Sequence, residues 1–304
     1  MLDCGGIPTD EASPDLRMKA HPLAALAILT FTVLSCGSGA LAASHPHIKK
    51  RSKSDSDINA IGHRRIAQGP NVYSLAKENQ IGKALSEEVE RTSKLLTDPA
   101  ITDYIDRVAQ AIAKNSDALM PITVRVIDSD SIQTFTLPGA YQYVSRGLLL
   151  RLAGEGEMAS VLARGIAHTA LRSTTTLATK AEIMRPSSIT PDAGGFPMAV
   201  ALTSVEMHSD DELDADYFGV QYLYKTGYDP ECFVSFVQRI WGSGATASKH
   251  HAAFRAYPPL DERLAALRSE ISKILPPRDG ATVSTPEFDA FEDRLRAPKS
   301  DGQK

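Results

Sequence analysis

Residues 157–172 combine an apolar helical pattern with three residues of chemical interest, Arg164, Gly165 and His168. Apolar side chains recur there at three- and four-residue spacing, so we predict a buried helix. Arg164 and His168 stand four residues apart, which places both on one face. In an H-E-x-x-H pattern, histidines at these two positions bind a metal ion and the glutamate acts as general base. Of the three pattern residues, only the second histidine is present here, as His168.

Two acidic residues further along the chain are candidate partners for this helix. Glu212 and Asp216 stand at i and i+4 of a helix predicted over 209–225, so both carboxylates point the same way. A pair of carboxylates at this spacing most often lies on a solvated helix face. Here Ala215 and Phe218 indicate a partly buried helix, and buried carboxylates need a partner.

The elements that position these residues are predicted from hydrophobic periodicity. Period-two alternation predicts a strand over 122–126, and a second strand pair is expected on either side of a Pro138-Gly139 turn. Further helices are predicted over 78–96, 101–113, 229–241 and 260–274. The fold class is therefore α+β, mostly helical with a small β-sheet.

The N-terminal region has the pattern of an export signal. After Met18 and Lys19, an apolar run spans 23–34, and small residues end at Ala42 as an A-x-A cleavage site. The run is short for a membrane span, which takes about 20 apolar residues. Cleavage after Ala42, an uncleaved anchor and lipidation at Cys36 are the alternatives. Each of them predicts an exported protein, periplasmic or attached to a membrane.

The whole chain is divided into four predicted parts. Residues 1–42 are an N-terminal extension with the signal peptide or anchor, and residues 43–70, rich in polar and basic side chains, are a polar linker. Residues 71–274 carry the periodic patterns and form the domain. Residues 275–304 are polar and are predicted to be a disordered tail.

Composition excludes two classes of protein. The chain of 304 residues has a formal net charge of -4, whereas duplex-binding proteins carry a strong basic excess, so nucleic acid is not an expected partner. If the N-terminus is removed, at most Cys36 and Cys232 of its three cysteines remain. A disulfide framework is therefore excluded.

Seven sequence blocks follow one another between residues 73 and 274. They are Ile81-Gly82, Phe135-x-Leu-Pro-Gly139 with Tyr143-Val-x-Arg-Gly-Leu148, Glu157 to Ala163, Ile166-Ala-His168, Glu212-x-x-Ala-Asp216 with Gly219, Gly227-Tyr-Asp-Pro230, and Pro258 before Asp261-Glu-Arg-Leu264. Together they resemble the HtpX/BepA/CAAX-prenyl-endopeptidase-like family of zinc metallopeptidases, of the gluzincin type. The resemblance implies a zincin-like fold with a mixed sheet, whose edge strand flanks the active-site cleft.

The resemblance also implies roles for the matching positions. His168 and Glu212 match two ligands of the family's zinc ion, and Asp216 matches the aspartate that orients the first histidine ligand. Arg164 stands at that first-ligand position. Gly165 stands at the position of the glutamate that activates water.

Two further features of the family have counterparts in this chain. Tyr257 stands where a late histidine often precedes the proline, so that imidazole is missing. The segment Phe135, Thr136, Leu137 and Pro138 matches the edge strand along which these enzymes lay a substrate backbone.

These departures favour a pseudopeptidase. A guanidinium has no lone pair to offer a metal ion, and glycine cannot act as a base. One histidine and one carboxylate are two protein ligands, whereas catalytic zinc uses three and a water molecule. We therefore interpret the chain as an exported member of the family with a degenerate active site. It is expected to bind zinc weakly or not at all, and to bind envelope proteins or peptides.

Two other functions remain open on the sequence alone. The first is an active zinc metalloendopeptidase of envelope protein quality control, with His208, His250 or His251 as substitute ligands. The second is a structural subunit of an envelope complex.

The arginine at the first-ligand position leads to a specific prediction. Without a metal ion, two carboxylates near an apolar core need another positive partner. We predict that Arg164 pairs with Asp216, Glu212 or both, because its planar fork can bridge carboxylates. The alternative is that Arg164 extends through the cleft to solvent.

Overall fold

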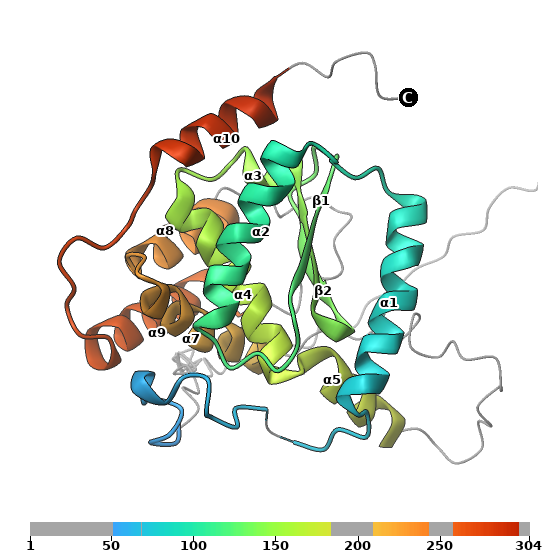
Figure 1. The fold of residues 1–304 in the computed structure, drawn as a ribbon. Coiled ribbons are helices and arrows are strands. Elements are labelled where there is room, and N and C mark those ends of the chain that lie inside the picture. Colours follow the sequence, from blue (N-terminus) through green and yellow to red (C-terminus); the bar gives the residue numbers. More distant parts are fainter. Residues whose placement is uncertain (1–50, 68, 184–208, 243–257, 298–304) are drawn as a thin grey trace, which may run out of the picture. The chain divides into compact units, whose positions relative to one another are not determined.

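The computed structural model describes residues 51–67, 69–183, 209–242 and 258–297 (Figure 1). By internal contacts the chain divides into two units, Met1–His45 and Pro46–Lys304, and every described residue belongs to the second. The predicted export signal therefore lies outside the described residues. Within the described part of the chain, no helix is both long and apolar enough to cross a membrane.

A three-stranded sheet lies at the centre of the second unit. Its strands are β1 (Thr123–Ile127), β2 (Thr134–Leu137) and β3 (Tyr141–Ser145). Their order is β1-β3-β2, with β1 parallel and β2 antiparallel to β3. The sheet is mixed, as predicted, and β2 lies at one edge of it.

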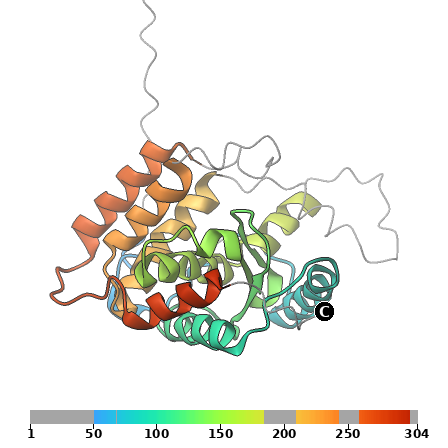
Figure 2. The same cartoon turned by 90° about the horizontal axis from the view of Figure 1, so that it is seen from above.

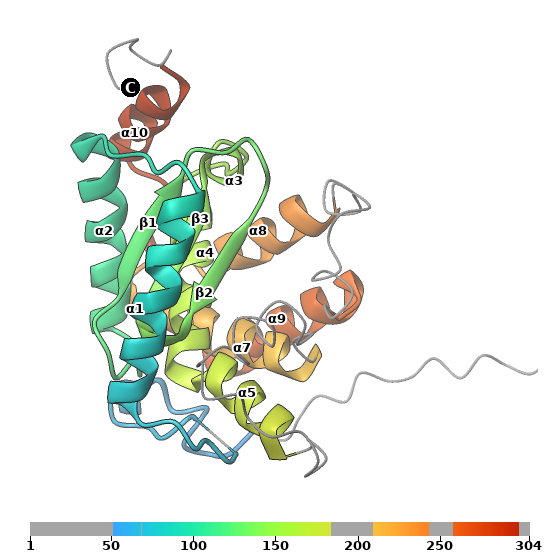
Figure 3. The ribbon, with the colours of Figure 1, turned by 90° about the vertical axis from the view of Figure 1, so that its right-hand side faces the viewer.

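Helices cover both faces of this sheet (Figures 1 and 3). The described helices are α1 (Leu75–Thr92), α2 (Pro99–Lys114), α3 (Arg146–Leu149), α4 (Glu155–Leu171), α5 (Ser173–Ile183), α7 (Ser209–Thr226), α8 (Glu231–Gly242), α9 (Leu260–Ile274) and α10 (Pro286–Arg296). Two neighbouring residues of β3 show which helix covers which face. Gln142 donates to the Val161 carbonyl of α4 at 3.1 Å, whereas the Tyr143 hydroxyl reaches the Ser86 carbonyl of α1 at 3.4 Å.

A tight turn joins β2 to β3 at the predicted position. Pro138 begins the turn, and Gly139 has a φ of 73°, in the left-handed region that favours glycine. The turn also packs closely on α1, because a β-carbon added to Gly139 would lie 2.8 Å from the Asn79 Cα atom. Glycine is therefore required both for the turn and for the contact with α1.

The predicted helices are present, and both ends of α1 are shifted by several residues. Ser74 accepts a hydrogen bond from the Lys77 amide at 3.2 Å, so α1 begins three residues before the predicted position 78. It ends at Thr92 rather than at 96. The reason is that residue Leu95 pairs with Ile127 at the edge of β1 instead of continuing the helix.

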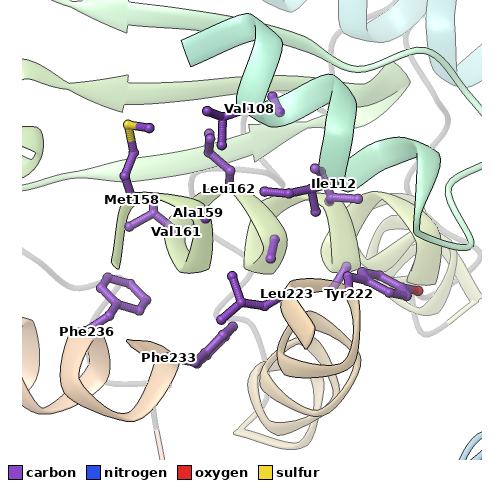
Figure 4. Packing of buried hydrophobic residues seen from close by; sticks show 14 of the residues in the cluster. Val108, Ile112, Met158, Ala159, Val161, Leu162, Tyr222, Leu223, Phe233 and Phe236 are labelled. Atoms are coloured by element: carbon purple, nitrogen blue, oxygen red, sulfur yellow. The ribbon is translucent and has the colours of Figure 1, made fainter. Parts of the chain in front are cut away.

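The central helix α4 is buried along its whole length, as the sequence predicts. Leu162 of α4 belongs to one hydrophobic cluster with Val108 of α2 and Leu223 of α7 (Figure 4). Helix α7 comes especially close, since a β-carbon added to its Gly219 would lie 3.3 Å from the Arg164 Cα atom. This close approach brings the two candidate helices of the site together.

The prediction of a polar linker over 43–70 is wrong for residues 51–67, which fold against the domain. Arg64 is buried, with Nη2 2.6 Å from Asp117 Oδ2 and Nη1 2.7 Å from Gln221 Oε1 of α7. Ile66 is buried as well. The charges suggested a solvated segment because the groups that pair with them lie far away in the sequence.

The prediction of a disordered tail over 275–304 is wrong for its described part. Figure 2, a view from above, shows α10 packed beside α2, and this contact buries Phe288 and Phe291. Thr285 caps α10 and also donates to the carboxylate of Glu155 at the start of α4. A mostly polar segment is thus ordered by a few apolar side chains and one buried carboxylate.

A buried carboxyl beside the Arg64 network has a perturbed acidity. Glu270 of α9 accepts a hydrogen bond from Gln221 Nε2 at 2.9 Å. Burial raises its pKa well above the usual 4.5, and the charge of Asp216 adds to this, whereas the Gln221 hydrogen bond and the charges of Arg51 and Arg64 oppose it. The folded-state pKa thus exceeds the unfolded one. The stability contributed by this group is full below the unfolded pKa and lost as pH rises through the folded one.

We expect Glu270→Gln to remove this pH dependence, because the amide keeps a neutral hydrogen-bonding partner for Gln221 and cannot ionise. The stability of the variant relative to the natural protein should increase as the pH is raised above about 5 in urea denaturation. Asp261→Asn, at an exposed position of α9, is the matched control and should show no such trend. A constant difference for Glu270→Gln would contradict the assignment.

Candidate functional site

The structure brings four of the predicted site residues into one cluster between α4 and α7. Arg164 and His168 come from α4, and Glu212 and Asp216 come from α7. The i,i+4 spacing places each pair on one helix face, and the two faces meet. All four side chains are buried. Their charges must therefore be satisfied within the cluster.

Arg164 contacts both carboxylates of α7. Its Nη2 atom forms an ion pair with Glu212 Oε2, and its Nε atom lies 3.1 Å from Asp216 Oδ1. This confirms the predicted pairing. The alternative of a solvent-directed side chain is wrong, because Arg164 is only 5% exposed.

A second arginine, which the sequence reasoning missed as a site residue, completes the cluster. Arg263 of α9 binds Asp216 through two hydrogen bonds, Nε to Oδ2 at 2.7 Å and Nη2 to Oδ1 at 2.9 Å. Its guanidinium lies 4.2 Å from the centre of the Trp241 ring. The signal was present in the block Asp261-Glu-Arg-Leu264, to which no partner could be assigned from sequence.

His168 is a neutral imidazole at the edge of the cluster. Its Nε2 atom lies 3.8 Å from Glu212 Oε2, and its Nδ1 atom lies 3.3 Å from the Ser173 hydroxyl at the start of α5. Burial, followed by the charges of Arg164 and Arg263, holds the pKa of His168 well below its usual value. The imidazole therefore keeps a lone pair that could accept a hydrogen bond or bind a metal ion.

The position of a general base is filled by another side chain. A β-carbon added to Gly165 would lie 2.2 Å from Gln142 Nε2 and 2.4 Å from Gln142 Cδ. Gln142 is itself 1% exposed and is tied to the Val161 carbonyl. A glutamate at position 165 therefore requires Gln142 to move or to be replaced.

The described residues do not fit a catalytic zinc ion. His168 and Glu212 are two donors, and the guanidinium of Arg164 already pairs with Glu212. Across the described ranges, no group of three or more His, Cys, Asp or Glu side chains is placed to hold a metal ion. The candidate substitute ligands and the late aromatic residue lie outside the described residues; they are His208, His250, His251 and Tyr257.

The predicted edge strand ends beside His168. A pocket at this end is lined by Thr136, Leu137 and Pro138 together with His168 and Ser173. Phe135, the first residue of the predicted segment, lies on the other face of the sheet. Its ring stacks on Tyr143 at 5.0 Å between centroids. The structure thus places part of the predicted substrate strand at the cluster.

Two backbone conformations uncommon for residues with side chains border the same pocket. Ala140 has a φ of 70°, and Arg172, the residue that ends α4, has a φ of 53°. Arg172 is held by Glu78, with Nε 2.8 Å from Oε1. Such conformations persist where the surrounding structure holds them, and they cluster at functional sites.

These features define the class of the protein. A mostly helical α+β domain places a motif helix, a carboxylate helix and an edge strand together, as in zincin-like metallopeptidases. The sequence model of Peptidase family M48 matches residues 99–271, which is more than half of the chain. The chain belongs to this family.

The chain is also similar in sequence to several curated proteases. A "Beta-barrel assembly-enhancing protease" of Yersinia pestis is 23% identical over 221 residues, and the Escherichia coli (strain K12) protein of that name is 21% identical over 221 residues. A relative from Vibrio cholerae is 28% identical over 222 residues. Each match covers 67% of this chain, but only 46%, 45% and 46% of the respective relatives. The chain thus spans about half the length of the relatives that it matches.

We expect Arg164 and Glu212 to be strongly coupled in stability. Removing one partner of a buried ion pair typically costs about 3–5 kcal/mol, so Arg164→Ala and Glu212→Ala should each lower the free energy of unfolding by about that much. The double variant should cost less than the sum by about 1–3 kcal/mol. Denaturant unfolding of the four proteins measures this cycle.

Glu212 is the better second position for this cycle, because Asp216 also binds Arg263 and its loss would leave two buried arginines. A control cycle pairs Arg164→Ala with Glu88→Ala, an exposed residue of α1. That pair should be additive to within about 0.5 kcal/mol. The buried interaction would be disproved if Arg164 and Glu212 were equally additive.

Proposed function

We propose that this M48-family protein is an exported pseudopeptidase, which binds proteins or peptides of the cell envelope along β2 and does not cleave them. The observation that carries this proposal is the guanidinium of Arg164, paired with the carboxylate of Glu212 at the position where the family's first zinc ligand stands. A group that stays protonated at this position blocks the ligand set.

The loss of hydrolysis rests on two independent changes. Without a general base at Gly165, about two to four orders of magnitude in rate are lost. Without a zinc ion, no electrophile polarises a carbonyl and no bound water has a lowered pKa. Gln142 supports the proposal further, because it occupies the space that a side chain at position 165 would need.

The envelope setting of the proposal comes from the relatives and from the predicted N-terminal export signal. The names of the relatives refer to β-barrel assembly and to proteolysis, and we transfer only the setting of envelope protein quality control. The apolar run over 23–34 supports export, and cleavage after Ala42 or lipidation at Cys36 would leave the protein periplasmic or membrane-attached. Its partners are then folding or damaged envelope proteins.

We expect the purified protein to show no chelator-sensitive cleavage of casein and to hold less than one zinc ion per chain. Removing metal with EDTA should leave the thermal midpoint unchanged, because the arginines already neutralise the carboxylates of α7. Elemental analysis, a casein assay and calorimetry make these measurements. Chelator-sensitive cleavage that is lost in His250→Ala or His208→Ala would instead establish the alternative, an active metalloendopeptidase with substitute ligands.

We further expect zinc binding to be recoverable by three substitutions. Arg164→His restores a third ligand, Gly165→Glu restores the base, and Gln142→Ala provides the space that the glutamate needs. The triple variant should bind about one zinc ion per chain, as three protein ligands do in catalytic sites. The matched control retains Gln142 and should be less stable than the triple variant. Equal stability of the two would show that Gln142 does not obstruct position 165.

A further inference from the structure

One end of the domain is formed by two segments, residues 51–73 and residues 114–122 between α2 and β1. Figures 1 and 3 show both of them at the end of the domain where α1 begins. Hydrogen bonds join the two segments. The Gly62 amide donates to Asp117 Oδ1 at 2.8 Å, and Arg64 Nε donates to Asp117 Oδ2 at 3.0 Å. We call the surface of these two segments the arm face.

The arm face carries two exposed apolar side chains. Val72 and Leu119 are each 66% exposed, the highest values among the large apolar residues of the described part of the chain. The Val72 amide donates to Thr179 Oγ1 of α5 at 3.1 Å. Met120, which follows Leu119, lines a pocket together with Thr175 of α5. Both side chains, the apolar pair of this face, therefore lie close to α5.

A third exposed apolar side chain lies elsewhere. Val283 is 55% exposed, and its carbonyl accepts a hydrogen bond of 2.8 Å from the Gly156 amide at the start of α4. His168, which lines the same pocket as Met120, is near the other end of this helix. From Gly156 to His168 the helix rises about 18 Å. Val283 is therefore a reference position away from the arm face.

The exposed charges of the arm face are mainly positive. Lys53, Arg65 and Lys114 are exposed and form its basic cluster. Of the three carboxylates in the two segments, two are buried and only Asp57 is exposed. The sequence adds two lysines directly before Arg51. Apolar side chains beside exposed cations are suited to a surface that carries anionic headgroups over an apolar interior.

The course of the chain favours a membrane as the occupant of this face. The apolar run over 23–34 and the alternative processing sites at Cys36 and Ala42 all precede Arg51, the first described residue. Arg51 Nη1 lies 2.6 Å from Asp214 Oδ1, which fixes the chain to α7. Between Cys36 and Arg51 the chain spans at most about 50 Å. An anchored chain therefore enters the domain through the segment that forms the arm face.

We propose that the arm face docks on the surface of an anionic lipid bilayer. The apolar pair enters the headgroup region, and the basic cluster contacts the lipid phosphates. Because Met120 lines the pocket beside His168, docking holds this pocket close to the bilayer. The inference goes beyond the proposed function, since it concerns another surface and holds whether or not the site cleaves peptides.

The test compares a polarity-sensitive fluorophore at two positions of the full-length protein. Leu119→Cys places the fluorophore on the arm face, and Val283→Cys, at the reference position, is the matched control. Cys4→Ser and Cys36→Ser are present in both proteins. They remove lipidation at Cys36 and restrict labelling to the new thiol, because Cys232 is buried.

The labelled proteins are mixed with phosphatidylcholine vesicles that contain either no anionic lipid or about one third phosphatidylglycerol. At low salt, we expect the emission at position 119 to shift to shorter wavelength with the anionic vesicles only. The emission at position 283 should not change. Added salt should reverse the shift, because it screens the attraction between the basic cluster and the headgroups.

A second set of variants tests the basic cluster. In the protein labelled at position 119, the cluster is replaced by Lys53→Gln, Arg65→Gln and Lys114→Gln. The vesicle concentration for a half-maximal shift should then rise about a hundredfold, since each basic residue near an anionic surface contributes about fivefold. The matched control removes the same charge at exposed positions elsewhere, by Arg91→Gln, Lys94→Gln and Arg294→Gln. It should leave the half-maximal concentration unchanged to within about twofold.

Four results would overturn the inference. They are the absence of a shift at position 119, equal shifts at positions 119 and 283, an equal shift with neutral vesicles, and an equal loss of binding in the control charge variant. The first two would show that this face does not meet the bilayer, and the last two that its cations do not select anionic lipid. Zinc content and casein cleavage are measured separately, so each of these results leaves the proposed function standing.

Discussion

Two carboxylates buried on α7, Glu212 and Asp216, require a positively charged partner. The ion pairs that meet this requirement hold the surrounding helices together. An unpaired carboxylate in an apolar interior costs several kcal/mol or takes up a proton. Arg164 contacts both carboxylates, and Arg263 forms two hydrogen bonds with Asp216. Because these arginines come from α4 and α9, one cluster joins three helices that are distant in sequence. The covering ring of Trp241 lies over both guanidinium groups and shields the cluster further.

A guanidinium and a metal ion can neutralise the same carboxylates, but they differ in chemistry. The guanidinium remains protonated and has no vacant position at which water could be activated. Next to Arg164, Gly165 carries no base, and Gln142 occupies the space beside it. Arg164 and Gly165 thus keep charge neutralisation and packing, but they supply neither a metal ligand nor a base at these two positions.

The edge strand β2 is largely independent of this cluster. Its position follows from the Gly139 turn, the ladder to β3 and the packing of α1, none of which involves the arginines. Binding of an extended segment requires outward backbone groups and suitable faces, but no activated water. Under the proposed function, the fold would keep a recognition surface although its catalytic groups are replaced, because function resides in sites carried by the fold.

The sequence alone determined the elements whose signals are local. The apolar periodicity of α4, the Pro138-Gly139 turn and the i,i+4 spacing of Glu212 and Asp216 depend on neighbouring residues, so they could be read without coordinates. The pairing of Arg164 could also be predicted, because burial of two carboxylates demands a cation. The tertiary structure alone decided the role of Arg263, the filling of the Gly165 site by Gln142, and the order of residues 51–67 and of α10. In each of these, the partners are far apart in the chain, and such contacts leave no periodic trace in the sequence.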